Sequence, residues 1–256
     1  MDQNRTKTSA PLKKGKVTKA RHDILINKPM DTGITPLMAA AFKGYVDVVT
    51  YLLDIKVAVD NADDNKSTAL HYACINNHAE IVRLLLRYGA KVDPFDQWHQ
   101  TPFHISCTYG HIDIIKLLLF CDEPITSSIG SKKRISLSSD NPSICDPFSH
   151  QNLHINKSVD LTDMDIEGDT ALHAACYNEH IEVGKLLLKV GINVNEVNSK
   201  GQTPLLVACA NGFFNIAQFL IDKKACINQS DNDKFTPLFY ASQGNPDIVE
   251  LLIEHK

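Results

Sequence analysis

The sequence predicts an all-α-dominated repeat solenoid in which hairpin-like turns connect successive pairs of helices. Three observations lead to this fold class: one pattern recurs six times, each copy carries the signals of two short helices, and polar segments separate the copies. The threonine that opens each copy recurs at intervals of 33, 33, 69, 33 and 33 residues, at Thr35, Thr68, Thr101, Thr170, Thr203 and Thr236. An interval of 69 residues is one period plus 36 further residues. We therefore expect two blocks of three repeats, separated by an insertion.

The first helix of each copy is indicated by its opening threonine. A threonine hydroxyl caps a helix N-terminus, and the fixed φ of a following proline suits the first helical position. Thr-Pro pairs stand at positions 35–36, 101–102, 203–204 and 236–237. Residues suited to the left-handed conformation that ends a helix follow in four copies, at Gly44, Asn77, Gly110 and Gly212.

A second helix follows in each copy. In the third copy its apolar residues form a broad surface, which can pack against neighbours on more than one side: Ile114, Ile115, Leu117, Leu118 and Leu119. Polar segments such as DNADDNKS at 60–67 predict a hairpin-like turn into the next copy. The unit is therefore a helix, a turn, a second helix and a hairpin.

Segments such as STALHYACINNHAEIVRLLL and QTPFHISCTYGHIDIIKLLL resemble the ankyrin repeat, and the resemblance covers residues 31–256 apart from the insertion. It implies helix pairs stacked into a curved solenoid, with hairpins projecting at right angles and a concave recognition surface. We assign repeats 1–3 to residues 31–124 and repeats 4–6 to residues 161–256. Four copies depart from the repeat pattern. Lys56 replaces the glycine that closes the second helix of the first copy, and the third copy runs from Cys121 straight into the insertion, so the turns of these two copies are uncertain. Lys224 replaces the same glycine in the fifth copy, and the sixth copy is one residue short between its helices.

Two segments lie outside the predicted repeats. Residues 1–30 carry eight basic and two acidic side chains. They include few large apolar residues, so the surface they could bury cannot offset the entropy lost when the chain becomes ordered, and we expect a basic flexible tail.

Residues 125–160 form a Ser-rich insertion that we expect to be disordered; a plain solvated linker and a degenerate seventh repeat are the alternatives. Within the insertion, the sequence Lys132-Lys133-Arg134-Ile135-Ser136 is similar to a basophilic-kinase site, which makes Ser136 a candidate for phosphorylation.

Residue types that could carry chemistry fall at repeated positions. Three histidines stand three residues after the opening threonine (His71, His104, His173), and three more open the second helix (His78, His111, His180). The resemblance implies that both sets form hydrogen bonds within and between repeats. Phosphate-binding glycine motifs are absent from the sequence, and we expect no enzyme activity, no cofactor and no metal site. One alternative is that Cys145, His150 and His154 hold a soft metal ion.

Cysteine usage and hydropathy bear on the compartment. Four of the seven cysteines recur six residues after the threonine, where they should be small core residues: Cys74, Cys107, Cys176 and Cys209. The sequence shows neither a signal peptide nor an apolar run long enough to span a membrane. We therefore expect a reducing compartment, cytoplasmic or nuclear.

Specificity in a repeat protein must come from positions that vary between repeats, at the hairpin tips and at the end of the first helix. Trp and Tyr are the commonest binding hot spots, so Trp98, Tyr109 and Tyr177 are the expected anchors, unless Trp98 folds down onto the edge of the solenoid. The full set of candidate partner-binding residues is Gln97, Trp98, Gln100, Thr108, Tyr109, Ile166, Glu167, Tyr177, Phe42 and Phe235. Acidic residues expected at the tips favour a partner with a basic segment: Asp64, Glu167, Asp169 and Asp233. The resemblance further implies hydroxylation at Asn195 and Asn228.

The expected function is protein-protein recognition by a monomeric adaptor or scaffold. One alternative is the recognition arm of a larger enzyme, channel or ubiquitin-ligase receptor. A second is a regulator that reaches nucleic acid or membrane through its basic tail. The residues after the tail carry a net charge of about −10, which argues against a nucleic-acid surface there, and we expect neither nucleic acid nor membrane as a partner.

Overall fold

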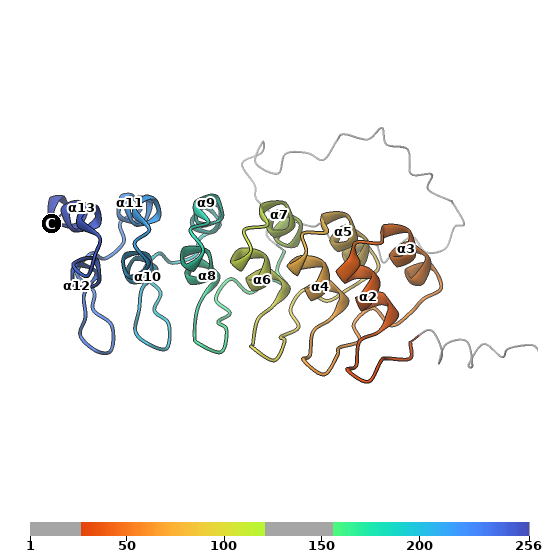
Figure 1. Cartoon of the computed structure of the whole chain (residues 1–256). Coiled ribbons are helices and arrows are strands. Elements are labelled where there is room, and N and C mark those ends of the chain that lie inside the picture. The colour runs from red at the N-terminus through yellow and green to blue at the C-terminus, as the bar shows by residue number, and fades with distance from the viewer. Residues whose placement is uncertain (1–26, 121–155, 256) are drawn as a thin grey trace, which may run out of the picture.

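The computed structural model describes residues 27–120 and 156–255, which form six helix pairs stacked side by side (Figure 1). This confirms the predicted all-α-dominated solenoid. The inner helices are α2 (Pro36–Lys43), α4 (Ala69–Ile75), α6 (Pro102–Thr108), α8 (Ala171–Tyr177), α10 (Pro204–Asn211) and α12 (Pro237–Ala241). Their outer partners are α3 (Val46–Asp54), α5 (Ala79–Arg87), α7 (Ile112–Phe120), α9 (Ile181–Lys189), α11 (Phe214–Asp222) and α13 (Pro246–Glu254).

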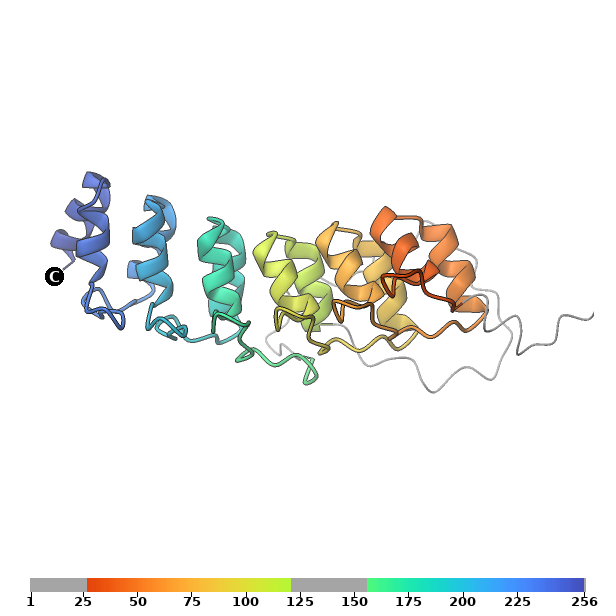
Figure 2. The same cartoon turned by 60° about the horizontal axis from the view of Figure 1, so that its bottom comes forward.

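The helices lie in two rows, and the hairpins project from the row of inner helices (Figure 1). The tilted view shows the same arrangement with the helix pairs side by side above the hairpins (Figure 2). Each inner helix packs against its outer partner and against the next inner helix, including α6 against α8 across the position of the insertion. The insertion therefore does not separate the two blocks of repeats.

The opening threonines cap the inner helices as the sequence predicts. The Thr35 hydroxyl accepts a hydrogen bond from the backbone N–H of Met38 at 3.3 Å, and the same bond recurs at Thr101, Thr203 and Thr236. At the other end of two inner helices, Gly44 and Gly212 adopt φ of 79° and 74°. A residue with a side chain is strained at such φ values, so glycine suits both positions.

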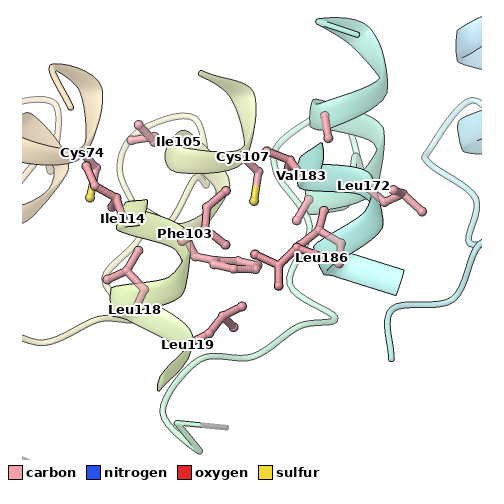
Figure 3. Packing of buried hydrophobic residues seen from close by; sticks show 14 of the residues in the cluster. Cys74, Phe103, Ile105, Cys107, Ile114, Leu118, Leu119, Leu172, Val183 and Leu186 are labelled. Carbon is pink, nitrogen blue, oxygen red and sulfur yellow. The ribbon is translucent and has the colours of Figure 1, made fainter. Parts of the chain in front are cut away.

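The core runs the length of the stack between the two rows of helices. Phe103, the largest fully buried side chain, points from α6 toward Leu186 of α9 and toward Leu119 of α7 (Figure 3). The four cysteines at the repeated position are buried free thiols. Burial raises the pKa of the Cys74 and Cys209 thiols to about 12, so neither is a nucleophile at neutral pH.

In repeats 2 to 6 the hairpin is closed by one acidic or amide side chain. In the second repeat, the carboxylate of Asp63 accepts hydrogen bonds from the N–H groups of Asn65 and Ser67, at 3.0 and 2.8 Å. The same position is held by Asp96, Asp165, Asn198 and Asp231 in the later repeats. Within the described residues the predicted hairpins are therefore side-chain-capped turns with isolated β-bridges, such as that between Ala62 and Thr68, rather than longer strand pairs.

Neighbouring hairpin tips are joined by backbone hydrogen bonds, which we call the tip ladder. The N–H groups of Asp64, Gln97, Ile166, Ser199 and Asn232 donate to the carbonyls of Thr32, Asn65, Trp98, Glu167 and Lys200 in the preceding repeats. The bond from Ile166 to Trp98, at 3.0 Å, crosses the junction at which the insertion enters. Repeats 3 and 4 therefore meet at their tips as the other repeats do.

The solenoid includes residues that the sequence assigns to the flanking segments. Asn156 donates to the carbonyls of Leu119 and Leu118 at 2.7 and 3.2 Å, and Val159 is 9% exposed. Residues 156–160, assigned to the insertion, therefore close the third repeat. Asn27, assigned to the tail, accepts a bond from the N–H of Ala58 at 3.0 Å. Residues 1–26 and 121–155 lie outside the described residues, so the expectations for the tail, for Ser136 and for the rest of the insertion stay predictions.

Candidate functional site

The candidate partner-binding residues of repeats 3 and 4 come from two places. Trp98 and Ile166 lie on adjacent hairpin tips, and their side chains are 50% and 65% exposed. Tyr109 and Tyr177 stand at the far end of α6 and α8. The inner helices therefore separate a tip cluster, Trp98 and Ile166, from a helix-end cluster, Tyr109 and Tyr177.

The sequence also groups with these residues several that the structure engages internally. The side-chain amide of Gln100 donates to Asp165 at 3.4 Å, and the Thr108 hydroxyl donates to the carbonyl of His104 at 3.0 Å. Glu167 is exposed but lies 3.0 Å from the Lys200 ammonium group. Gln97 is exposed next to Trp98. Of this set, Gln100 and Thr108 are the least available to a partner.

The outer candidates belong to other repeats. Phe42 packs edge-on against Tyr72, with ring centroids 5.8 Å apart, and Phe235 stacks on Phe239 at 4.1 Å. Both are partly exposed, at 41% and 37%. They lie in the first and last repeats, so they extend the surface but do not join the tip cluster.

His99 is a tip residue that the sequence analysis missed. It adopts a φ of 61°, its ring stacks on Phe95 at 4.0 Å, and its Nδ1 lies 2.8 Å from the carbonyl oxygen of Met164. The residue at the same position of every described hairpin has a positive φ. The sequence signal that could have identified His99 as a tip residue was its place at this repeat position, next to Trp98.

Asp169, expected as an exposed acidic tip, is buried, so that expectation is wrong. Its side chain is 7% exposed and accepts a hydrogen bond from the Asn198 amide of the next hairpin at 2.8 Å. Burial raises the pKa of the Asp169 carboxyl to about 6, and the Asn198 hydrogen bond partly opposes that shift. The carboxylates that reach solvent near the tip cluster are those of Asp165 and Glu167.

Replacing Asp169 with asparagine is expected to stabilise the protein at neutral pH. An Asp in the unfolded chain has a pKa of about 3.9. Between that pH and about pH 6, Asp169 holds a proton in the folded chain that it has lost in the unfolded chain. The free energy of unfolding therefore falls as pH rises through this window. We expect Asp169→Asn to raise the free energy of unfolding by about 1–2 kcal/mol above pH 6, after allowing for partial solvent screening, and to change it little at pH 4.

Urea unfolding at pH 4 and pH 7.5 measures the two gains. Glu167→Gln is the matched control, because this neighbouring carboxylate is exposed and its ion pair with Lys200 lies in water. An equal gain for Asp169→Asn at both pH values would show that the carboxylate charge is not responsible.

The histidines are structural, as expected. In His71, His104 and His173 the Nδ1 atom lies 2.9–3.0 Å from the opening threonine hydroxyl, and Nε2 donates to a carbonyl of the following repeat. Burial lowers the pKa of all three, so they stay neutral at pH 7. In the second set, His78, His111 and His180 use Nε2 to bind a carbonyl of the preceding repeat.

Comparison with known proteins identifies the type of repeat. A family model described as ankyrin repeats (three copies) matches residues 37–129, 138–231 and 191–256, which together span most of the chain. The chain belongs to the ankyrin-repeat family. A search of curated protein sequences found no match.

Solved ankyrin structures superpose on most of the chain. The ankyrin repeat domain of Bcl-3, described as a unique member of the IkappaB family, has 25% identity and a TM-score of 0.67, with 88% of this chain and 87% of that chain covered. An ankyrin repeat domain from Acinetobacter baumannii has 26% identity and a TM-score of 0.66, covering 86% and 97%. The human ASB11 ankyrin repeat domain, at 21% identity, a TM-score of 0.65 and coverage of 86% and 83%, shows the shared fold.

Neither a candidate metal site nor a membrane-spanning helix is found in the described part of this ankyrin array. Its residues contain no group of three or more His, Cys, Asp and Glu side chains able to hold a metal ion, and Cys145, His150 and His154 fall outside the described ranges. None of the helices from α2 to α13 is long and apolar enough to span a membrane.

Proposed function

We propose that this protein is an adaptor or scaffold that binds a partner protein through the tip cluster and helix-end cluster of repeats 3 and 4, without catalysis. Ankyrin repeats generally mediate protein-protein interactions. The observation that carries the proposal is the half-exposed Trp98 beside the exposed Ile166, on tips fixed to each other by the tip ladder. A large aromatic side chain held on a rigid backbone loses little entropy on binding, which is typical of hot spots.

A basic segment of the partner fits the charge of this surface. Within the tips at 97–100 and 165–168 the described side chains include Asp165 and Glu167 but no Lys or Arg. The pKa of Tyr177 is raised to about 12 by burial and by the charges of Asp169, Asp165 and Glu167, so the negative charge of the tips also acts at Tyr177. The Lys200–Glu167 pair is exposed, and such pairs contribute about 0–1 kcal/mol, so a partner cation can replace Lys200.

Trp98→Ala is expected to weaken partner binding by about 2 kcal/mol, roughly thirtyfold, because hot-spot aromatics dominate such interfaces. Affinity capture from cell lysate with the wild type and the variant identifies the affected partners, and titration with each captured partner measures the loss. Tyr51→Ala is the matched control, since Tyr51 is 63% exposed on α3 of the first repeat.

Both variants should keep the helical content and melting temperature of the wild type, since neither side chain is buried. Partners lost with Trp98→Ala and kept with Tyr51→Ala support the proposal. Equal capture by all three proteins would move recognition to other repeats or to the flanking segments. The free cysteines support a cytoplasmic or nuclear place for this function.

We also propose hydroxylation at Asn195 and Asn228. The Asn195 side chain accepts a hydrogen bond from the N–H of Cys226 at 2.7 Å, whereas Asn228 is exposed. Intact-mass analysis after co-expression with an asparaginyl hydroxylase should show the addition of oxygen. Loss of one oxygen addition in Asn228→Ala would locate the more accessible site, and an unchanged wild-type mass would remove the proposal.

Phosphorylation of Ser136, outside the described residues, remains a proposal as well.

A further inference from the structure

The last repeat exposes an apolar groove on the side that faces away from α10 and α11. The groove has a volume of about 710 Å³ and lies between α12 and α13; we call it the trailing groove and define it by Ala241, Pro246, Val249, Glu250, Ile253 and Glu254. Ile253 is 53% exposed. At its position in earlier repeats, Leu53, Leu86, Leu119 and Ile221 are at most 9% exposed, and Leu188 is partly buried. The trailing groove is therefore a stacking surface that no described residue covers.

The interior of the stack shows what such a groove accepts. Inside the stack, each outer helix presents two apolar residues, three positions apart, to the groove of the preceding repeat. On α5 these residues are Ile81 and Leu84, and both are at most 6% exposed. At the same positions of α3, which no described repeat precedes, Val48 and Tyr51 are 46% and 63% exposed. The preceding groove is thus what buries this pair. A helix with aliphatic residues at i and i+3 has the shape that the trailing groove fits.

The trailing groove carries negative charge where the groove of repeat 2 carries positive charge. Glu250 and Glu254 occupy the positions that carry Arg83 and Arg87 in repeat 2, and α12 and α13 contain no Lys or Arg. Glu254 is the last residue of α13, where the helix dipole disfavours a carboxylate. A cation placed beside Glu250 and Glu254 would relieve this repulsion, so the rim favours a basic partner.

We propose that the trailing groove binds an amphipathic helix of a partner protein, with two aliphatic side chains three residues apart and Lys or Arg on the flanking turns. This surface is separate from the tip cluster. A second copy of the chain is a poorer occupant, because its exposed Val48 and Tyr51 stand beside Asp47 on α3, and α3 carries no Lys or Arg to pair with Glu250 and Glu254.

The test uses the full chain and a fluorescent stapled helical peptide that presents Ile and Leu three positions apart with flanking Lys residues. Fluorescence anisotropy should show saturable binding, weakened at least about tenfold by Ile253→Asp. The double variant Glu250→Lys/Glu254→Lys should lose the Lys peptide and bind a matched Glu peptide. Tyr51→Asp and Trp98→Ala should bind the Lys peptide as the wild type does.

Circular dichroism checks that each variant keeps its helices, which is expected because Ile253 is half exposed and both glutamates lie on the rim. Several outcomes would overturn the proposal: no saturable binding, equal binding by Ile253→Asp, or wild-type affinity for the Glu peptide equal to that for the Lys peptide. Sedimentation that shows a dimer abolished by Ile253→Asp would make a second copy the occupant and would overturn it too.

Discussion

Replacing Phe103 with alanine is expected to reduce the free energy of unfolding by about 3–5 kcal/mol, the range for truncating a buried aromatic side chain. Phe103 is 1% exposed in α6 and points toward Leu186 of the fourth repeat (Figure 3). The truncation would leave a cavity where repeats 3 and 4 meet. Stability in a repeat array depends on contacts between neighbours, so we also expect the two blocks to unfold less cooperatively.

Urea unfolding followed by circular dichroism measures both effects. The matched control is Phe239→Ala: Phe239 lies on an inner helix, as Phe103 does, but is 40% exposed at the end of the stack. Its replacement should cost less than about 1 kcal/mol. Equal losses for the two variants would show that Phe103 does not couple the blocks.

Deleting residues 121–156 is expected to keep the fold and to raise the free energy of unfolding by as much as about 3 kcal/mol, the entropy cost of closing a flexible loop of that length. The deletion joins Phe120 to Lys157 and returns the spacing between Thr101 and Thr170 to 33 residues. Ser158 and Val159 then follow α7 in the register of Gly89 and Ala90 after α5.

A variant in which a Gly/Ser linker of equal length replaces residues 121–155, which leaves Asn156 and its bonds to Leu118 and Leu119 in place, is the control for loop length. It should be about as stable as the wild type if the native segment adds only length. Urea unfolding of the three proteins decides this. A deletion variant less stable than the wild type would mean that the removed segment makes stabilising contacts.

The sequence was sufficient for the helices because their start and end signals are local. Thr35 caps its helix, and Gly44 ends it, through contacts within a few residues. At two turns, Lys56 and Lys224 replace the glycine of the repeat pattern, and the turn at Lys56 was therefore uncertain. Both residues nevertheless adopt left-handed φ values, of 63° and 67°, since the surrounding repeat fixes the backbone there.

The features that the sequence did not reveal depend on neighbouring repeats. Asp169 is buried because Asn198, on the next hairpin, covers and binds its carboxylate. Val48 and Ile81 occupy the same repeat position with similar side chains, yet only Ile81 is buried, because a described repeat precedes it. The candidate site is divided within a single repeat, because Trp98 and Tyr109 are eleven residues apart in the chain but lie beyond opposite ends of α6.

The tip ladder is one of two levels at which directional bonds join neighbouring repeats. Its backbone bonds connect the hairpins along one edge. At the helices, His71 binds a carbonyl of the following repeat and His78 binds one of the preceding repeat. Hydrogen bonds depend on angle, so bonds at two separate levels resist the rotation of one repeat against the next more than apolar contacts alone would. The array therefore acts as a stiff rod segment, and a partner that binds Trp98 meets the neighbouring repeats at fixed positions.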